Sequence, residues 1–229
     1  MLQASHRACA RHGYESPRLQ AASNKLLLGR FGGMKELRQV TSNAAILDRA
    51  DVDTDQIIPK QFLKRIERSG YGEFLFYDWM KDPAFELHNP EYDGAEILIA
   101  GRNFACGSSR EHAAWALEDY GFRFVLAPSF SDIFHSNAIK SGLAPIELAE
   151  DDLARLKTAV AARNELTVDL ERLEITHPDG LRIAFAFDPY AQETLVHGLD
   201  DIARTLRRAD AISTYEASHP ARFDTHALA

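Results

Sequence analysis

The sequence predicts an α/β fold with a mixed sheet. Apolar runs of strand length alternate with amphipathic helical segments from Val40 to Arg163, and a hairpin pattern follows over residues 166–187. At 229 residues, 45% apolar and 26% charged, the chain can bury the core of one domain of moderate size. It has no continuous apolar run of about eighteen residues, so the sequence predicts no membrane span.

The first predicted elements are two strands separated by a long, mostly irregular stretch. Apolar runs mark the strands, Pro59 favours a helix start directly after it, and prolines mark the later loop. The predicted order is strand 40–47, polar loop 48–59, short helix 60–66, ambiguous aromatic segment 70–79, loop 82–94 and strand 97–100.

The later elements follow a clearer pattern. Helices are expected to end near Gly121 and Gly142, and the helix from Glu150 has acids in its first turn and bases later, which matches the helix dipole. A turn at residues 177–180 joins two short strands as a hairpin. The predicted order is helix 108–120, strand 122–127, helix 131–140, strand 144–148, helix 150–163, strands 166–169 and 173–176, strand 181–187 and a helical region 188–208.

The segment Glu96–Gly121 carries the most chemical information. After its strand, Ser108, Ser109, Arg110 and Glu111 open the predicted helix, and Ser108 with Glu111 has capping-box spacing. Two hydroxyls and a guanidinium therefore gather where free N–H groups and the positive end of the helix dipole point outward, which predicts an anion site. The alternative is that Ser108 only caps the helix and Arg110 is a solvated first-turn residue.

The charge is unevenly distributed along the chain. Residues 1–33 hold five Lys or Arg and one acid, which gives them a net charge of +4. Because the whole chain has a net charge of −8, the other 196 residues carry −12. An acidic body of this kind predicts no binding to nucleic acid, which favours a basic face. Anionic substrates must then be held by local groups.

The chain has two cysteines, Cys9 and Cys106, and no Cys-x-x-Cys. This usage excludes a disulfide framework and fits a reducing cytoplasm, which is the predicted location. It also predicts no metal site in this chain, because an iron–sulfur cluster or structural zinc needs several thiolates.

Residues 1–33 differ from the rest and are predicted to be a leader that is disordered or not part of the native protein. Three readings remain open: a translated leader before a true start at Met34, a disordered native extension, and a transit peptide. A secretory signal is excluded because a long apolar core is missing. Residues 34–229 are predicted to form a single domain with a C-terminal helical tail.

Three segments resemble motifs of one family. Gly101–Ala113, GRNFACGSSREHA, is similar to the signature of the aconitase superfamily's swivelling domain, and in particular of the small subunits of 3-isopropylmalate dehydratase, the leucine-pathway isomerase. Asp51–Pro59 with Phe62–Lys64 resembles the family's N-terminal motif, and Asp188–Ile202 its C-terminal motif. The resemblance runs from about Met34 to Glu216 in the expected order.

This resemblance implies a three-layer β/β/α swivelling domain and a hydro-lyase activity. The implied reaction converts 2-isopropylmalate to 3-isopropylmalate through isopropylmaleate, and the implied substrate is a small dicarboxylate. It also implies a partner, because the reaction uses a [4Fe–4S] cluster that a large subunit would carry in a heterodimer or higher assembly. The alternative is the small subunit of a related hydro-lyase of the methylmalate, dimethylmalate or homoaconitate type.

The resemblance also implies roles for individual residues. Ser108 matches the serine whose alkoxide removes the C–H proton, and Ser109 and Arg110 match positions that bind substrate carboxylate, for which a guanidinium fork is suited. Thr54 and Asp55 match a Thr-Asp pair lining the same site, where Asp55 would orient Arg110 or a water. A turn-forming aspartate in a polar loop is the alternative for Asp55.

The chain departs from aconitases in two ways that suit an isopropyl group in place of a carboxymethyl group. Ile58 replaces their serine, and no counterpart of their additional arginine is found. The residues expected to set specificity are Phe62, Leu63 and Lys64, although core packing explains Phe62 and Leu63 equally well.

Two further readings are weighed against the family resemblance. The first is a hydrolase with Cys106 or a serine as nucleophile and His112 as base. The sequence lacks the Gly-x-Ser-x-Gly elbow that such an enzyme would use, and no orienting residue can be assigned. Cys106 is therefore predicted to be a small loop residue. A non-catalytic domain that only binds an anion at 108–110 is the second reading.

Overall fold

The computed structural model describes residues 34–64 and 69–219, and the parallel strands of this part form one sheet. Its order is β2-β3-β4-β5 and all its neighbours are parallel. These strands are nearly all apolar because both faces of the sheet are covered. Their bounds are β2 Ala44–Leu47, β3 Ile97–Ala100, β4 Phe124–Ala127 and β5 Ala144–Glu147.

A second sheet is antiparallel throughout, in the order β1-β6-β7-β8. The chain thus combines parallel and antiparallel strands as predicted, and the structure separates the two kinds into different sheets. The predicted hairpin is confirmed in β7 and β8, which pair across the 177–180 turn. The strand bounds are β1 Gln39–Ser42, β6 Leu166–Asp169, β7 Glu174–Thr176 and β8 Arg182–Ala184.

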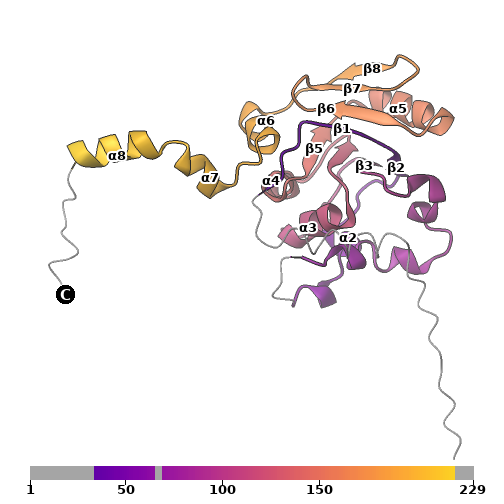
Figure 1. Cartoon of the computed structure of the whole chain (residues 1–229). Helices are drawn as coiled ribbons and strands as arrows, with labels where there is room; N and C mark the ends of the chain where they lie inside the picture. The colour runs from indigo at the N-terminus through magenta and orange to yellow at the C-terminus, as the bar shows by residue number, and fades with distance from the viewer. Residues whose placement is uncertain (1–33, 65–68, 220–229) are drawn as a thin grey trace, which may run out of the picture.

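The layers are visible in Figure 1, where the antiparallel sheet lies above the parallel sheet and α3 and α4 lie below it. Alternate side chains of the central parallel strands β3 and β4 enter two different cores. Leu98 and Val125 pack in the core that includes residues of α3 and α4, whereas Ile99 and Leu126 pack in the core that includes residues of the antiparallel sheet and α5. This confirms the β/β/α expectation.

The predicted strand 40–47 is wrong in one respect, because it is two strands belonging to different sheets. The break is at Asn43, whose side-chain amide donates to the carbonyl oxygens of Glu91 and Asp93 at 3.1 and 3.4 Å. The Ala44 N–H donates a hydrogen bond to Asn164 Oδ1 at 2.8 Å. The Asn164 contact satisfies the backbone N–H where the chain crosses between sheets, and the Asn43 amide holds the crossing against the segment that contains residues 91 and 93.

The helices of the sheet region agree with the prediction, except that the helix predicted over 108–120 begins at Glu111. Ser131 Oγ accepts from Phe134 N–H at the start of α4, and Gly142 ends it at φ 83°. Gly121 ends α3 at φ 120°, and the acids Glu150, Asp151 and Asp152 occupy the first turn of α5. The bounds are α3 Glu111–Tyr120, α4 Asp132–Ser141 and α5 Glu150–Ala162.

The C-terminal helical region is divided, whereas the sequence predicted helix throughout 188–208. Gly198 has φ +60°, and a Cβ there would lie 2.2 Å from Met34 O, so the chain turns between α6 and α7. The helix bounds are α6 Pro189–Val196, α7 Asp201–Leu206 and α8 Ala209–Ser218. None of the described helices is long and apolar enough to cross a membrane.

The long connection between β2 and β3 holds one short α-helix and several 3₁₀ turns. The helix lies at Thr54–Ile57, inside the predicted loop, and the predicted helix 60–66 is a single 3₁₀ turn over its first three residues. Residues 65–66 lie outside the described part. The bounds are α2 Thr54–Ile57, η1 Lys60–Phe62, η2 Gly72–Phe74, η3 Trp79–Lys81, η4 Glu86–His88 and η5 Pro90–Tyr92.

Candidate functional site

The predicted site residues lie at the carboxyl edge of the parallel sheet. The segment 48–64 follows β2, the segment 101–110 follows β3, and residues 128–131 follow β4. Because parallel strands end at the same edge, these three segments meet there, and this is where open α/β sheets bind ligands. Two predicted motifs, about fifty residues apart in sequence, thus form one surface.

Backbone hydrogen bonds join the first two segments. Cys106 N–H donates to Val52 O and Thr54 N–H donates to Cys106 O, each at 3.0 Å. The buried Thr54 hydroxyl then donates to Ser108 O at 3.0 Å. We call this set of contacts the 52–108 junction. It fixes the backbone of Ser108 against the N-terminus of α2.

Gly107 allows the two segments to approach this closely. Its φ is +85°, and a Cβ at this position would lie 2.0 Å from Asp53 Oδ2. The Asp53 carboxylate cannot easily move, because it caps α2 by accepting from Asp55 N–H at 2.6 Å. Gln56 completes the capping box by accepting from Asp53 N–H at 2.8 Å.

Arg110 is held by an ion pair to Asp55. One Nη of the mostly buried guanidinium donates to Asp55 Oδ1, and Lys60 Nζ lies 3.2 Å from Asp55 Oδ2. Burial alone would raise the pKa of Asp55, but hydrogen bonds and charges from Arg110 and Lys60 outweigh it and lower the pKa. Asp55 therefore stays ionised at neutral pH and holds the Arg110 guanidinium by this contact.

The predicted capping box at Ser108 and Glu111 is wrong. Helix α3 begins at Glu111, and the residue before it, Arg110, is extended at φ −128° and makes no side-chain cap hydrogen bond. A capping serine must directly precede the helix, whereas Ser108 is anchored to α2 through Thr54. The Ser108 and Ser109 hydroxyls are exposed, and neither has a hydrogen-bond partner among the described residues.

The predicted specificity residues lie beside this edge with different exposure. The Phe62 ring stacks on Phe74 with centroids 4.0 Å apart and meets Tyr77 edge-on at 4.8 Å. Phe62 and Leu63 are partly buried against the core, and Lys64 is exposed. Ile58 is fully buried in the same core, so its side chain acts there as a packing residue.

Cys106 and His112 do not form a nucleophile and base. Burial, together with the charges of Asp53 and Asp51, raises the pKa of the Cys106 thiol, which keeps it protonated at neutral pH. Burial lowers the pKa of His112, whose ring centroid lies 4.7 Å from that of Trp115. These surroundings fit the prediction that Cys106 is a loop residue.

Sequence reasoning missed three contributors to the site. Lys60 pairs with Asp55, as described above. Ser129 Oγ accepts from Asn103 N–H at 2.9 Å, and the Ser131 hydroxyl donates to Ala105 O at 2.7 Å, so the loop after β4 holds the loop after β3. The available signal was the position of both serines in the short segment between a buried strand, which ends at Ala127, and the next helix.

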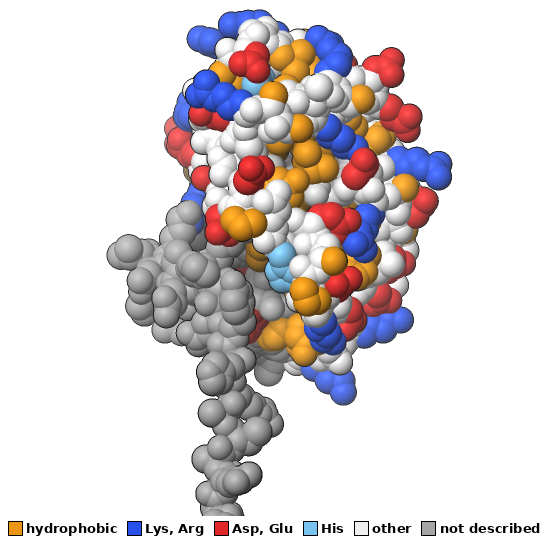
Figure 2. Space-filling model, turned by 90° about the vertical axis from the view of Figure 1, so that its right-hand side faces the viewer, with side chains coloured by type: hydrophobic (Ala, Val, Ile, Leu, Met, Phe, Trp, Pro, Cys, Tyr) orange, Lys and Arg blue, Asp and Glu red, His pale blue; other side chains and the backbone are white. Residues whose placement is uncertain are grey.

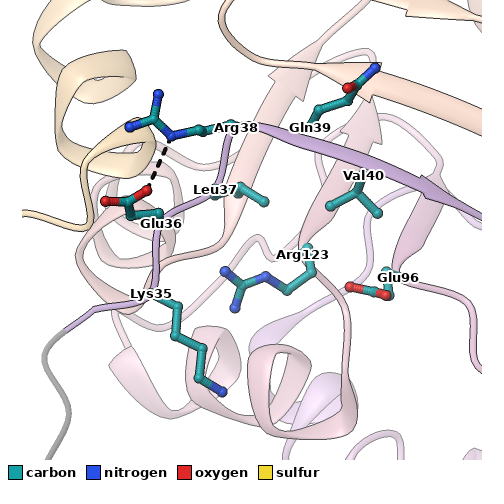
Figure 3. Close-up of a pocket in the computed structure, with 8 residues that line it drawn as sticks. All are labelled: Lys35, Glu36, Leu37, Arg38, Gln39, Val40, Glu96 and Arg123. Carbon is teal, nitrogen blue, oxygen red and sulfur yellow. Dashed lines mark hydrogen bonds and ion pairs between the residues drawn. The ribbon is translucent and has the colours of Figure 1, made fainter.

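A hollow of about 240 Å³ lies at the opposite edge of the parallel sheet and contains none of the predicted site residues. Figure 3 shows the segment Lys35–Val40 running past Glu96 and Arg123, which directly precede β3 and β4. Within the described ranges, no group of three or more His, Cys, Asp or Glu could hold a metal ion. On the face shown in Figure 2, acidic and basic side chains are interspersed.

Comparisons with known proteins identify two matching family models and many relatives. The model of the aconitase C-terminal domain matches residues 34–151, and the model of the C-terminal domain of 3-isopropylmalate dehydratase small subunits matches residues 201–224. The 3-isopropylmalate dehydratase small subunit of Bacillus subtilis is 51% identical over 191 residues, covering 80% of this chain and 96% of the relative. The one of Koribacter versatilis is 52% identical over 198 residues, covering 81% and 100%.

A solved structure agrees with these relatives. The crystal structure of 3-isopropylmalate dehydratase from Methanocaldococcus jannaschii matches with a TM-score of 0.58 and 27% identity, over 77% of this chain and 99% of that chain.

Proposed function

The chain belongs to the family of 3-isopropylmalate dehydratase small subunits, and on this premise we propose that it is the small subunit of that hydro-lyase in leucine biosynthesis. The observation that supports this most directly is the 52–108 junction. It brings Thr54 and Asp55 beside Ser108 and Arg110, the residues to which the motifs give a role.

The proposed reaction removes water from 2-isopropylmalate and adds it back in the other orientation to give 3-isopropylmalate. Its first step takes a proton from a carbon next to a carboxylate, which is a weak acid, so a positioned base is needed. When bound, the [4Fe–4S] cluster supplies Lewis-acid chemistry at the leaving hydroxyl. With two cysteines and no metal-binding group among its described residues, this chain does not fit as the cluster's holder, and we assign the cluster to the large subunit.

Ser108 is the proposed base. Its hydroxyl is exposed at the sheet edge, while its backbone is fixed by the Thr54 hydroxyl. The fixed backbone positions the Ser108 hydroxyl oxygen, while the side chain makes no hydrogen bond to another described residue that would prevent this oxygen from reaching a substrate. In this proposal the buried Thr54 is a positioning residue, because its hydroxyl is already donated to Ser108 O.

Arg110 and Ser109 are the proposed binders of a substrate carboxylate. The ion pair with Asp55 limits the positions of the guanidinium, and a planar fork can donate two parallel hydrogen bonds to a carboxylate. Arg110 lies directly before α3, where the first N–H groups of the helix have no partner within the helix. These N–H groups, together with Arg110, would stabilise the developing negative charge.

Phe62, Leu63 and Lys64 are proposed to contact the variable side of the substrate. The stacking of Phe62 on Phe74 supports a firm apolar wall, which suits an isopropyl group. The relatives favour isopropylmalate over the alternative substrates of methylmalate, dimethylmalate or homoaconitate type, and they favour an enzyme over a non-catalytic anion-binding domain. We propose the cytoplasm as the location, in agreement with the cysteine usage.

Reconstitution tests the proposal. The purified full-length chain is mixed anaerobically with its large subunit, after that subunit has been loaded with iron and sulfide, and conversion of 2-isopropylmalate is followed. We expect no turnover by either subunit alone and turnover on mixing. We also expect Arg110→Lys to raise KM and lower kcat, because it keeps the charge but loses the fork.

Arg102→Lys is the matched control for that variant. Arg102 follows the same strand and pairs with Asp51 at 3.7 Å, but it lies outside the proposed site. Turnover by this chain alone, or equal effects of the Arg110 and Arg102 substitutions, would contradict the proposal.

A further inference from the structure

Helices α7 and α8 form an arm that leads away from the two sheets. Figure 1 shows the arm, residues 201–219, continuing from α6 and projecting beyond the body of the molecule. Every residue from 205 to 219 is exposed. Its base is fixed, because Arg204 donates to Glu193 Oε2 at 2.9 Å and to Thr194 Oγ1 at 2.5 Å. No hydrogen bond or ion pair joins α8 to another of the described elements.

The arm nevertheless carries large apolar side chains. Ile202 and Leu206 of α7, and Ile212 and Tyr215 of α8, are 39–71% exposed. Members of each pair are three or four residues apart, so each pair lies on one face of its helix. Large apolar side chains exposed in this way, several within one short segment, are typical of interaction sites.

Helix α8 also needs a surface for its stability. An isolated ten-residue helix is marginal in water even for sequences with strong helix formers. This one, ADAISTYEAS, contains Ile, Ser, Thr and Tyr, which have only moderate helix propensity. Helical structure here is therefore expected to depend on packing of its apolar face.

We propose that this arm docks on the large subunit, an inference that rests on the proposed function. A standard interface buries about 800 Å² per partner, of which a little over half is apolar, and the four exposed apolar side chains between residues 202 and 215 can contribute to that apolar part. The identity of the partner is indicated by the family models. The aconitase C-terminal domain model ends at residue 151, whereas residues 201–224 are matched by the model named for the dehydratase small subunit.

There is a physical reason why the arm should belong to separate small subunits and not to aconitase C-terminal domains. A C-terminal domain is covalently joined to the rest of its enzyme, which keeps its effective concentration high. A separate subunit lacks that link and needs contact area to stay bound. An arm outside the sheets can supply this area while the catalytic edge remains free to face the substrate.

Two pairs of substitutions in α8 test the arm. The variant Ile212→Asp with Tyr215→Asp adds two charges to the apolar face. The control Ser213→Asp with Ala217→Asp adds two charges to the opposite face of the same helix. Full-length chains carrying each pair are titrated into the loaded large subunit, and Kd, Tm and kcat at saturation are measured. We expect the first pair to raise Kd at least tenfold and the control to change it less than threefold.

Tm and saturating kcat should be unchanged in both, because α8 lies outside both cores and outside the proposed site. Equal Kd values for the two variants would overturn the proposal while leaving the proposed function intact. The proposal would also be overturned if the wild-type chain alone formed a dimer and the apolar-face variant did not, because the arm would then bind a second copy of the chain. If the wild-type chain failed to bind the large subunit at all, that result would contradict the proposed function, and with it the docking of the arm.

Discussion

Ser108 and Ser109 are adjacent exposed hydroxyls to which we assign different tasks. Ser108→Ala should lower kcat by a factor of about 10² to 10⁴ with little change in KM, because a base acts mainly in the transition state. Ser109→Ala should mainly raise KM. Steady-state kinetics of the assembled enzyme separates the two effects.

The structure also predicts the stability of these variants. Ser108 is not a helix cap, so Ser108→Ala should change the free energy of unfolding by less than about 0.5 kcal/mol. Ser108→Asp should fold and remain inactive, because a carboxylate cannot replace a strong alkoxide base. Near wild-type turnover by Ser108→Asp would show that another group is the base.

The stability that Asp55 contributes to the folded chain is expected to depend on pH. Its pKa is lowered in the folded chain, so the stability it contributes is complete above the unfolded value of about 3.9 and is lost as the pH falls through the folded pKa. The difference in Tm between wild type and Asp55→Asn should therefore stay constant from about pH 8 to pH 5 and shrink below about pH 4. A difference that instead grew with falling pH would contradict the ion pair with Arg110.

Among the elements, the turn at Gly107 is the one on which the site most depends. Gly107→Ala should destabilise the chain in two ways, through the positive φ and through contact of the new Cβ with the Asp53 cap. Gly180→Ala is the matched control, since φ is +91° there and a Cβ meets nothing within 4 Å. The control should cost about 1 kcal/mol.

Gly107→Ala should cost at least about 1 kcal/mol more than the control, as for other strained backbone positions. It should also lower activity, because the 52–108 junction positions Ser108. Denaturant unfolding of both variants measures the difference. If the two costs were equal, the contact between residue 107 and Asp53 would have no energetic role.

At the scale of the whole molecule, we propose that residues 34–229 form the functional unit. Both matched family models lie within residues 34–224, and the predicted leader, 1–33, lies outside the described residues. Deleting 1–33 should therefore leave Kd for the large subunit and kcat unchanged in the reconstitution assay. Lower soluble yield in the producing cells, or lost delivery to an organelle, would show that the segment has a function of its own.

Local sequence patterns and motifs were enough to predict the fold class, most of the later elements and the family. The strands β3 to β6 and the helices α3 to α5 were predicted within a few residues, because local rules decide them: apolar runs, acids at helix starts, and glycines at Gly121 and Gly142. The candidate site residues came from motifs, and the structure brings Thr54, Asp55, Ser108 and Arg110 together at one sheet edge.

Other features could not be predicted, because long-range contacts there override the local pattern. The strand 40–47 divides at Asn43, where the Asn43 side chain donates to the carbonyls of residues 91 and 93 and the Ala44 N–H donates to Asn164, contacts that no local rule reveals. The capping box belongs to Asp53 and Gln56, while Ser108 is anchored by Thr54 from a segment more than fifty residues away. Sequence rules describe neighbours along the chain, whereas these contacts depend on which strand ends meet in space.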